Sequence, residues 1–461
     1  MLTHTANGDS RHPLWLHVRE FAVPPSMIET ATARRRAGDW AGACAAAGVD
    51  VDFNLRTVAR THGPELVARV RADLRHLAPD LLRWHLPRVA PDGLLRPGLT
   101  LTLARYEGAG YDGSCPVHLV VRTPPVWADS GQRFGLALWD HSRPEPAELR
   151  HPRPRPARRF RFDLHRHLWD ARRSDELRSR SGADRAPGLP PEGVPSGPGR
   201  AVDRWAAEAE LLLRADEGRP DGRVTVRLGS GHRLVLDVAA DGSRSGAPAL
   251  LAASAAPQDG TAGALPVLPD AATWVPPDLE LLRAGLIDAD RLHPLVASAL
   301  VPDRPTDRTA RSPDRPGEPR LVECRGALHR IGLVDGALAP LDHDPAEIRR
   351  EELLLALSGT PLPCLRAIDE ALRRPDRLSG VRERLLHGDT AGALAVVEAL
   401  LGPGAVLRSG ALREELEAAA MRRVTYGLFR AGLAGPGPKR AVIPSHARPR
   451  DRRRRRPRHS A

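Results

Sequence analysis

The chain has 461 residues, of which 41% are hydrophobic and 27% charged, and its formal net charge is +12. This composition supports a packed core over most of the length, and no apolar run approaches the roughly 18 residues that a transmembrane helix needs. The first nine residues have neither a basic start nor an apolar stretch. We therefore expect no signal peptide, no membrane contact and a cytoplasmic location.

Residues 12–180 are expected to form an N-terminal α+β domain. The segment 14–23 alternates apolar and polar residues and is predicted to be a strand, ended by Pro24 and Pro25. Helices are predicted over residues 26–37 and 39–47. A further amphipathic helix is predicted from Pro64, with its apolar stripe formed by Leu66, Val67, Val70, Leu74 and Leu77.

From Leu99 onward the apolar period changes to two. Three segments with this period are predicted to form an antiparallel meander of strands, at residues 99–106, 117–123 and 133–139. The domain thus consists of helices followed by a small sheet.

The remainder of the chain alternates loose and compact segments, because proline, glycine and alanine gather in some stretches and periodic apolar residues in others. The expected order is a Gly/Pro linker (181–200), a helix plus β-hairpin (201–239), an Ala/Gly/Pro-rich loose segment (240–272), a short helix pair (273–301), a Pro-rich linker (302–319), a hairpin plus helical domain (320–435) and a disordered Arg-rich tail (436–461). The fold class is therefore multidomain α+β, with helical hairpins, small antiparallel meanders and mobile linkers.

The last helix is expected to run from about Ala411 to Arg430. One apolar stripe is predicted on it, and this stripe is expected to pack on the helix at 391–401. Its members are Leu412, Leu416, Ala419, Ala420, Val424 and Leu428.

A short pattern occurs twice, 350 residues apart. Gly38-Asp39 and Gly388-Asp389 each follow an arginine by four residues and precede an Ala-Gly-Ala sequence. Glycine suits the left-handed end of one helix and aspartate caps the next, so each copy predicts the turn of a helical hairpin.

These two hairpins resemble isolated tetratricopeptide-type helix pairs, with residues 388–403 matching that pattern better than residues 38–48. No tandem array accompanies them, although repeat proteins are built from such arrays. The wider composition has a single lysine, Lys439, and few asparagines or isoleucines. It is similar to that of proteins from GC-rich actinomycete genomes, a resemblance that implies no particular activity.

Several motifs suggest chemistry that their context does not favour. The Gly108–Gly113 segment matches the glycine pattern of a dinucleotide-binding motif. That motif requires a helix after the glycines, whereas strand-like residues follow here, so a hairpin loop is expected. Asp342, His343 and Asp344 suggest a metal site, yet Asp344 suits a helix N-cap. His165 and His167 lie among arginines, so we expect a solvated basic face rather than metal ligands.

The four cysteines (Cys44, Cys115, Cys324 and Cys364) are too dispersed for a disulfide scaffold or a zinc site. Cys364 lies at a predicted helix start, where a thiolate is favoured, but a structural cysteine is the preferred interpretation. We assign no catalytic, cofactor-binding or metal-binding residue, and we expect no cofactor.

Positive charge is concentrated in two segments. Residues 439–461 contain ten basic residues and one acid, and residues 150–185 contain twelve arginines and five acids. The tail could bind nucleic acid through phosphates, bind an acidic protein partner, or merely reflect a GC-rich terminus. The residues available for such contacts are Arg448, Arg450, Arg452, Arg453, Arg454, Arg455, Arg456 and Arg458.

The leading hypothesis from the sequence is a non-enzymatic protein–protein interaction or adaptor protein with unknown protein partners. The first alternative is a nucleic-acid-associated protein anchored, without sequence preference, by the basic tail. The second alternative is a hydrolase that uses Asp342, His343 or Cys364.

Overall fold

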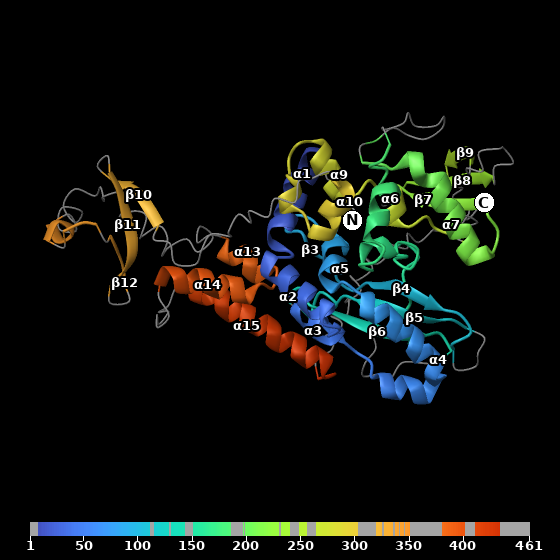
Figure 1. Ribbon diagram of the computed structural model, residues 1–461, viewed down its shortest axis with the longest axis horizontal. Helices are drawn as coiled ribbons and strands as arrows, with labels where there is room; N and C mark the ends of the chain where they lie inside the picture. The colour runs from blue at the N-terminus through green and yellow to red at the C-terminus, as the bar shows by residue number, and fades with distance from the viewer. Residues whose placement is uncertain are drawn as a thin grey trace, which may run out of the picture.

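The structure is a computed structural model of an α+β protein (Figure 1). It describes residues 8–110, 115–128, 131–142, 151–185, 197, 199–229, 232–239, 249–255, 264–302, 320–324, 327–334, 337–340, 342–344, 346–350, 380–401 and 411–433. No helix within these ranges is both long enough and apolar enough to cross a membrane.

The chain begins with helices that pack around one large core. They are α1 (Gly8–Phe21), α2 (Pro25–Arg36), α3 (Trp40–Ala46), α4 (Leu55–His76) and α5 (Pro79–His85). The strand predicted at 14–23 is wrong, because these residues belong to α1 and the turn after it. Leu14, Trp15, Val18 and Ala22 are buried at helical spacing, and this pattern outweighed the local alternation.

The helix predicted from Pro64 is confirmed as the second half of α4. Gly63 has a φ of 86° and breaks the helix just before Pro64. The residues of the predicted stripe are all buried in the main core: Leu66, Val67, Val70, Leu74 and Leu77.

The predicted meander forms a four-stranded sheet. Its strands β4 (Thr100–Tyr106), β5 (Val117–Arg122) and β6 (Phe134–Asp140) are antiparallel, and β1 (Val49–Val51) adds to β6 in parallel. The strand order is β1-β6-β5-β4, so β4 is an edge. A two-stranded ribbon, β2 (Arg88–Val89) with β3 (Leu94–Leu95), lies outside this sheet.

The segment after the sheet covers the β4 edge. The amide of Thr102 donates to the Phe160 carbonyl and the amide of Asp163 donates to the Thr102 carbonyl. Short helical turns follow at Arg166–Leu168 and Ser174–Glu176, and then α6 (Leu177–Ser181). The edge strand is thereby paired by irregular chain, which holds the basic segment 150–185 against the sheet.

A second, smaller core lies under the helix α7 (Trp205–Glu217). This helix packs on the antiparallel sheet of β7 (Gly222–Arg227), β8 (Arg233–Ala239) and β9 (Ala249–Ala255). The structure differs from the prediction for residues 240–272, since β9 and α8 (Asp270–Thr273) lie there. The alanines of β9 pair with β8 through backbone hydrogen bonds. Such bonds do not depend on the side chains, so the side-chain pattern of this segment did not indicate a strand.

Residues 273–301 belong to the first core instead of forming a unit of their own. They contain α9 (Pro277–Arg283), a turn at Ala289–Arg291 and α10 (Pro294–Leu300). Leu281 of α9 and Val296 of α10 are fully buried in that core. Asp278 also accepts hydrogen bonds from Arg19 of α1 at 2.6 and 2.9 Å, in an ion pair with both side chains 1% exposed.

The C-terminal part contains a sheet and a helical unit. The sheet is β10 (Arg320–Cys324), β11 (Ala327–Val334) and β12 (Ala337–Pro340), at the opposite end of the molecule from β7–β9 (Figure 1). The helices are α13 (Val381–Leu386), α14 (Thr390–Leu401) and α15 (Ala411–Arg430). They share a small core of their own.

The bounds predicted for α15 are confirmed, but its stripe is correct only in the first half. Leu412, Leu416 and Ala419 pack with Ala393 and Val397 of α14. Ala420, Val424 and Leu428 are exposed, and the second half turns Tyr426 inward instead.

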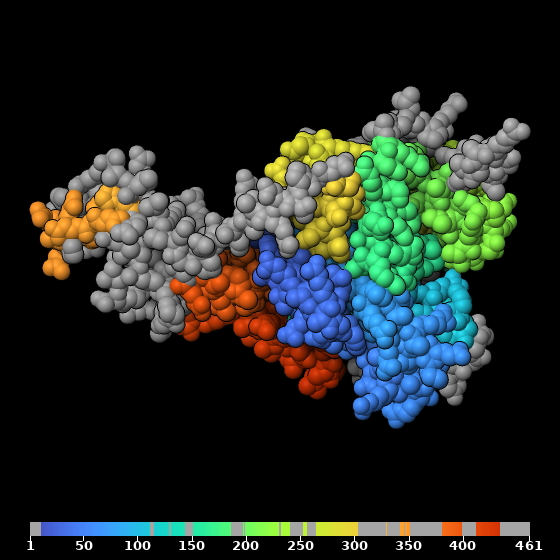
Figure 2. Space-filling model, in the orientation of Figure 1, coloured from blue at the N-terminus to red at the C-terminus, as the bar shows by residue number. Residues whose placement is uncertain are grey.

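The C-terminal half of α15 lies against the N-terminal body. The hydroxyl of Tyr426 donates to Asp50 at 2.7 Å, and Arg430 pairs with Asp50 at 2.8 Å and with Asp52. The ring of Phe429 meets Trp127 edge to face at 5.2 Å. Figure 2 shows the C-terminal helices resting on the surface of the first helices.

Candidate functional site

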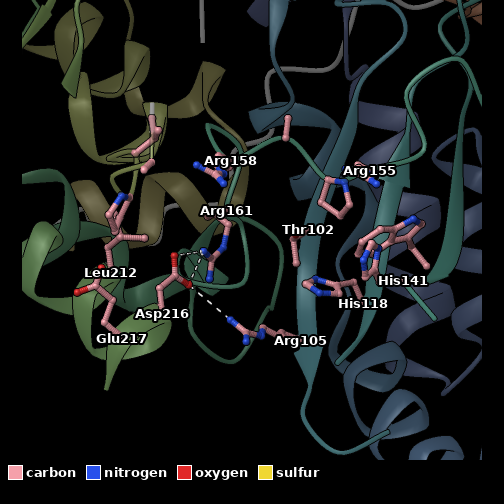
Figure 3. A pocket seen from close by; sticks show the side chains of 16 residues that line it. Thr102, Arg105, His118, His141, Arg155, Arg158, Arg161, Leu212, Asp216 and Glu217 are labelled. Atoms are coloured by element: carbon pink, nitrogen blue, oxygen red, sulfur yellow. Dashed lines mark hydrogen bonds and ion pairs between the residues drawn. The ribbon is translucent and has the colours of Figure 1, made fainter. Parts of the chain in front are cut away.

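A basic cavity lies between the two larger cores, with a volume of about 540 Å³. One wall is the β4–β6 sheet, another is the segment 155–161, and the third is the C-terminal half of α7 with residues 264–267 (Figure 3). This volume is in the range of pockets that hold small organic ligands.

The sheet wall presents one row of side chains across three strands. Arg105 of β4 faces His118 of β5, and His118 faces Trp139 of β6. His141, in the turn directly after β6, lines the same cavity. The ring of His118 meets that of Trp139 edge to face at 5.3 Å, and the Trp139–His141 centroids are 5.7 Å apart.

A β-bulge brings a fourth residue, Thr102, to this wall. Residues three apart on a regular strand point to opposite faces, yet both Thr102 and Arg105 line the cavity. The β4–β5 register shifts between Thr102 and Ala104, which supplies the extra residue. The bulge therefore places a hydroxyl and a guanidinium in the same cavity.

The second wall is held rigidly by ion pairs. Arg161 binds Asp163 with three hydrogen bonds of 2.8–3.1 Å, and binds Asp216 of α7 at 2.8 and 3.0 Å. Arg105 also lies 3.5 Å from Asp216. Asp216 therefore fixes Arg105 and Arg161, whereas Arg155 has no hydrogen bond or ion pair to another described residue.

Two polar atoms of the sheet wall are buried without a hydrogen-bond partner among the described residues: the hydroxyl oxygen of Thr102 and Nδ1 of His118. Burial, together with the nearby Arg105 and Arg161, lowers the pKa of His118 to about 4. Its ring is therefore neutral at pH 7, where one ring nitrogen donates and the other accepts. This wall can thus offer hydrogen bonds in both directions.

Several arginines of the basic segment 150–185 pair with acids from other parts of the chain. Arg159 pairs with Asp270, Arg166 with Asp73 and Arg180 with Glu208. Arg155 and Arg158 of the same segment are exposed and line the cavity.

The predicted turn residues Gly38 and Asp39 are confirmed in their local role, and so are Gly388 and Asp389. The two glycines have φ of 78° and 85°. Asp39 accepts from the amide of Gly42 at 2.8 Å, and Asp389 accepts from the amide of Gly392 at 2.9 Å. Each aspartate also pairs at 3.2 Å with the arginine five residues earlier, Arg34 or Arg384.

The two turns are used differently. Arg83 of α5, which is 2% exposed, donates to the carbonyl of His387 at 2.8 Å, to that of Gln132 at 2.6 Å and to that of Ala22 at 2.9 Å. The second turn is therefore bound to the N-terminal body through a buried guanidinium. Burial and the nearby Arg133 lower the pKa of Arg83 to about 10, so it remains charged at pH 7.

The solvated basic face predicted for His165 and His167 is wrong. Both rings are buried, and Nε2 of His165 lies 3.1 Å from Glu208. The physical reason is that the carboxylate of Glu208, on α7, binds His165 and Arg180, so this part of the segment is buried against α7 instead of facing solvent. No cluster of three or more metal-binding side chains occurs among the described residues.

Asp344 lies where the sequence predicts a helix cap: its side chain accepts from the amide of Ala346 at 3.0 Å. His343 stacks on His329 at 4.1 Å and lies 3.7 Å from Glu347. Cys44 is buried, and burial raises its thiol pKa to about 12, which opposes nucleophilic reactivity. Cys364 lies outside the described residues.

The remaining predicted contacts concern loops and the tail. Gly108 and Gly110 lie in the connection between the antiparallel strands β4 and β5, as expected of a hairpin, while residues 111–114 are not described. The arginines of the tail, Arg448 to Arg458, also lie outside the described residues.

Two signals in the sequence could have located the cavity. One is the charge excess of residues 150–185. The other is the change of apolar phase in β4, from Leu99, Leu101 and Leu103 to Ala104 and Tyr106, which records the bulge. Comparison of the chain with protein-family models, with curated proteins and with solved structures found no match.

Proposed function

We propose that this chain binds a phosphorylated small molecule in the basic cavity. The observation that carries the proposal is the gathering of Arg105, Arg155, Arg158 and Arg161 around a space of about 540 Å³. Two of these arginines share the carboxylate of Asp216, whereas Arg155 is exposed and has no hydrogen bond or ion pair to another described residue. Guanidinium groups bind phosphate oxygens through paired, charge-assisted hydrogen bonds.

This proposal agrees with the non-enzymatic class expected from the sequence, but it concerns a ligand site instead of an adaptor surface. The adaptor hypothesis and the tail-mediated nucleic-acid hypothesis remain separate predictions. The second hairpin turn contacts Arg83 of the same chain, so we base no function on that turn.

The test is titration calorimetry of the full chain with tripolyphosphate at 150 mM salt and without divalent cations. Charge-assisted hydrogen bonds contribute about 1.5–3 kcal/mol each, so the double variant Arg155→Gln/Arg158→Gln should bind at least tenfold more weakly. Arg71→Gln, an exposed change on α4, serves as the control and should leave the affinity unchanged.

The tail is present in every protein of this comparison, so its own attraction for polyanions cancels. Asp216→Asn supplies the opposite change, because it removes a negative charge from the cavity wall and should tighten tripolyphosphate binding severalfold. Equal affinities for the wild type and the double variant would place the anion elsewhere, for instance on the tail, and overturn the proposal.

A further inference from the structure

The cavity is larger and more varied than a phosphate group requires. Its arginines lie on the 155–161 segment and at the end of the β4–β6 row, while the remainder of that row consists of rings (Figure 3). Trp139 is half-buried and its neighbours on the wall are His118 and His141. Such a wall suits a flat ring, because aromatic faces and edges attract one another and exclude water.

Two polar atoms of this wall have no hydrogen-bond partner among the described residues. The Thr102 side chain is 1% exposed, and its hydroxyl has no partner among the described residues. Nδ1 of His118 is likewise buried and has no hydrogen-bond partner among the described residues. Buried polar atoms in proteins nearly always have partners, and a ligand that enters the cavity is one way to supply them.

The two atoms also restrict which ligand fits. A hydroxyl and a neutral imidazole each donate or accept, so they suit a ring whose edge carries both donors and acceptors. A nucleobase has such an edge, as well as a face that stacks on tryptophan. A plain aromatic acid has the face but lacks the edge.

Resting on the proposed function, we infer that the ligand is a nucleoside phosphate. Its base lies against Trp139, with its edge toward Thr102 and His118, and its phosphates lie toward Arg155 and Arg158. Arg105, fixed by Asp216 at the end of the row, closes the wall beside His118.

The experiment compares each of the four common ribonucleoside triphosphates with tripolyphosphate, by calorimetry on the full chain and without divalent cations. Stacking of a base on an aromatic ring adds affinity that tripolyphosphate cannot gain, so the best nucleotide should bind about fivefold more tightly than tripolyphosphate, or better. Trp139→Leu should remove this preference and leave tripolyphosphate binding unchanged. Trp127→Leu, at the contact with Phe429, is the matched control and should keep the preference.

Thr102→Val tests the hydrogen bond separately. The substitution keeps the shape of the side chain and removes a hydroxyl that has no described partner, so the fold should tolerate it. We expect the affinity for the best nucleotide to fall at least threefold and that for tripolyphosphate to stay constant. Unchanged nucleotide affinity in Thr102→Val would show that water, not the base, satisfies this hydroxyl, and would overturn the placement of the base.

The outcomes separate this inference from the proposed function. If all four nucleotides bind no better than tripolyphosphate, and Arg155→Gln/Arg158→Gln weakens both, the cavity binds anions but not bases. If that double variant weakens neither, the proposed function itself fails. A nucleotide preference that persists in Trp139→Leu would place the base away from the aromatic wall.

Discussion

The α2–α3 and α13–α14 hairpins have the same turn in different surroundings. In both, a glycine with positive φ ends one helix and an aspartate caps the next, and an arginine five residues earlier pairs with that aspartate. The first hairpin is built into the N-terminal body through Cys44 and Ala47. The second presents its turn to that body from 350 residues away in the sequence.

The difference shows which part of a hairpin is local and which is not. The turn depends on glycine, aspartate and arginine within six positions, so it forms identically in both places. The docking of the second turn depends on Arg83, Gly131 and Phe21, which lie outside the hairpin in the sequence. Changes that act only within the turn should therefore affect both hairpins equally, and changes that reach the docking contacts should affect only the second.

The largest effect is expected from Arg83→Met. This variant removes the buried cation that donates a hydrogen bond to the second turn, and it leaves the carbonyls of Ala22, Gln132 and His387 without their donor. Each unsatisfied buried group costs about 1–3 kcal/mol, so the free energy of unfolding should fall by more than about 3 kcal/mol in urea denaturation. Arg36→Met, on the exposed end of α2, is the control and should change it little. A similar result for both variants would mean that Arg83 does not hold the hairpin.

The next effect distinguishes the two turn glycines. A Cβ at Gly388 would lie 2.2 Å from the backbone oxygen of Gly131, whereas a Cβ at Gly38 would meet nothing within 4 Å. Both alanine variants suffer the left-handed φ, at about 1–2 kcal/mol. Only Gly388→Ala should also release α13–α15 from the body. Hydrogen exchange of the α14 amides should then quicken in Gly388→Ala and stay slow in Gly38→Ala.

These comparisons also show how much of the fold the sequence could predict. The antiparallel meander, the bounds of α15 and both turns were predictable, since each depends on residues close together in the chain. The strand predicted at 14–23 was wrong because Trp15 and Val18 are buried on one face of α1. The partner of Arg19, Asp278, lies 259 positions away, and no local pattern indicates it.

The cavity likewise combines a feature that the local sequence indicates with contacts that only the fold creates. Its basic segment was recognisable as a charge excess, but the acids that pair with Arg159, Arg166 and Arg180 come from α8, α4 and α7. Which arginines remain for a ligand could not be known before those partners were in place. The exposure of the second half of the predicted α15 stripe also depends on a distant contact. Tyr426 is buried there and binds Asp50, so a different face of the helix is covered.

Acid should loosen the second hairpin more than the first. His387 precedes Gly388 and is 1% exposed, while Ala37 occupies the equivalent position before Gly38. Burial, with the nearby Arg88, His17 and Arg83, lowers the pKa of His387 to about 3. The unfolded state, with an ordinary histidine pKa near 6.5, binds the proton first, so stability is complete above pH 6.5 and is lost as pH falls toward 3.

The expected loss for this one group is about 1.4 kcal/mol per pH unit within that window, or roughly 2 kcal/mol between pH 7 and pH 5. Hydrogen exchange of α14 at the two pH values, corrected for the intrinsic rate, measures it. His387→Ala copies the first hairpin and should remove most of this pH dependence. An unchanged pH dependence in that variant would assign the effect to other buried histidines, such as His85.

The smallest effect should be the same at both turns. Asp39→Ala and Asp389→Ala each remove one cap to a glycine amide, at 2.8 and 2.9 Å, and one arginine pair at 3.2 Å. Loss of an N-cap costs about 1 kcal/mol, and a partly exposed ion pair adds little. Thermal unfolding should therefore show two equal, modest losses, because the cap is a local feature that docking does not alter. A loss at Asp389 much larger than that at Asp39 would mean that its charge also supports the buried Arg83, whose pKa it raises. Asp389→Asn keeps a capping oxygen without the charge, and it would then reproduce most of the excess.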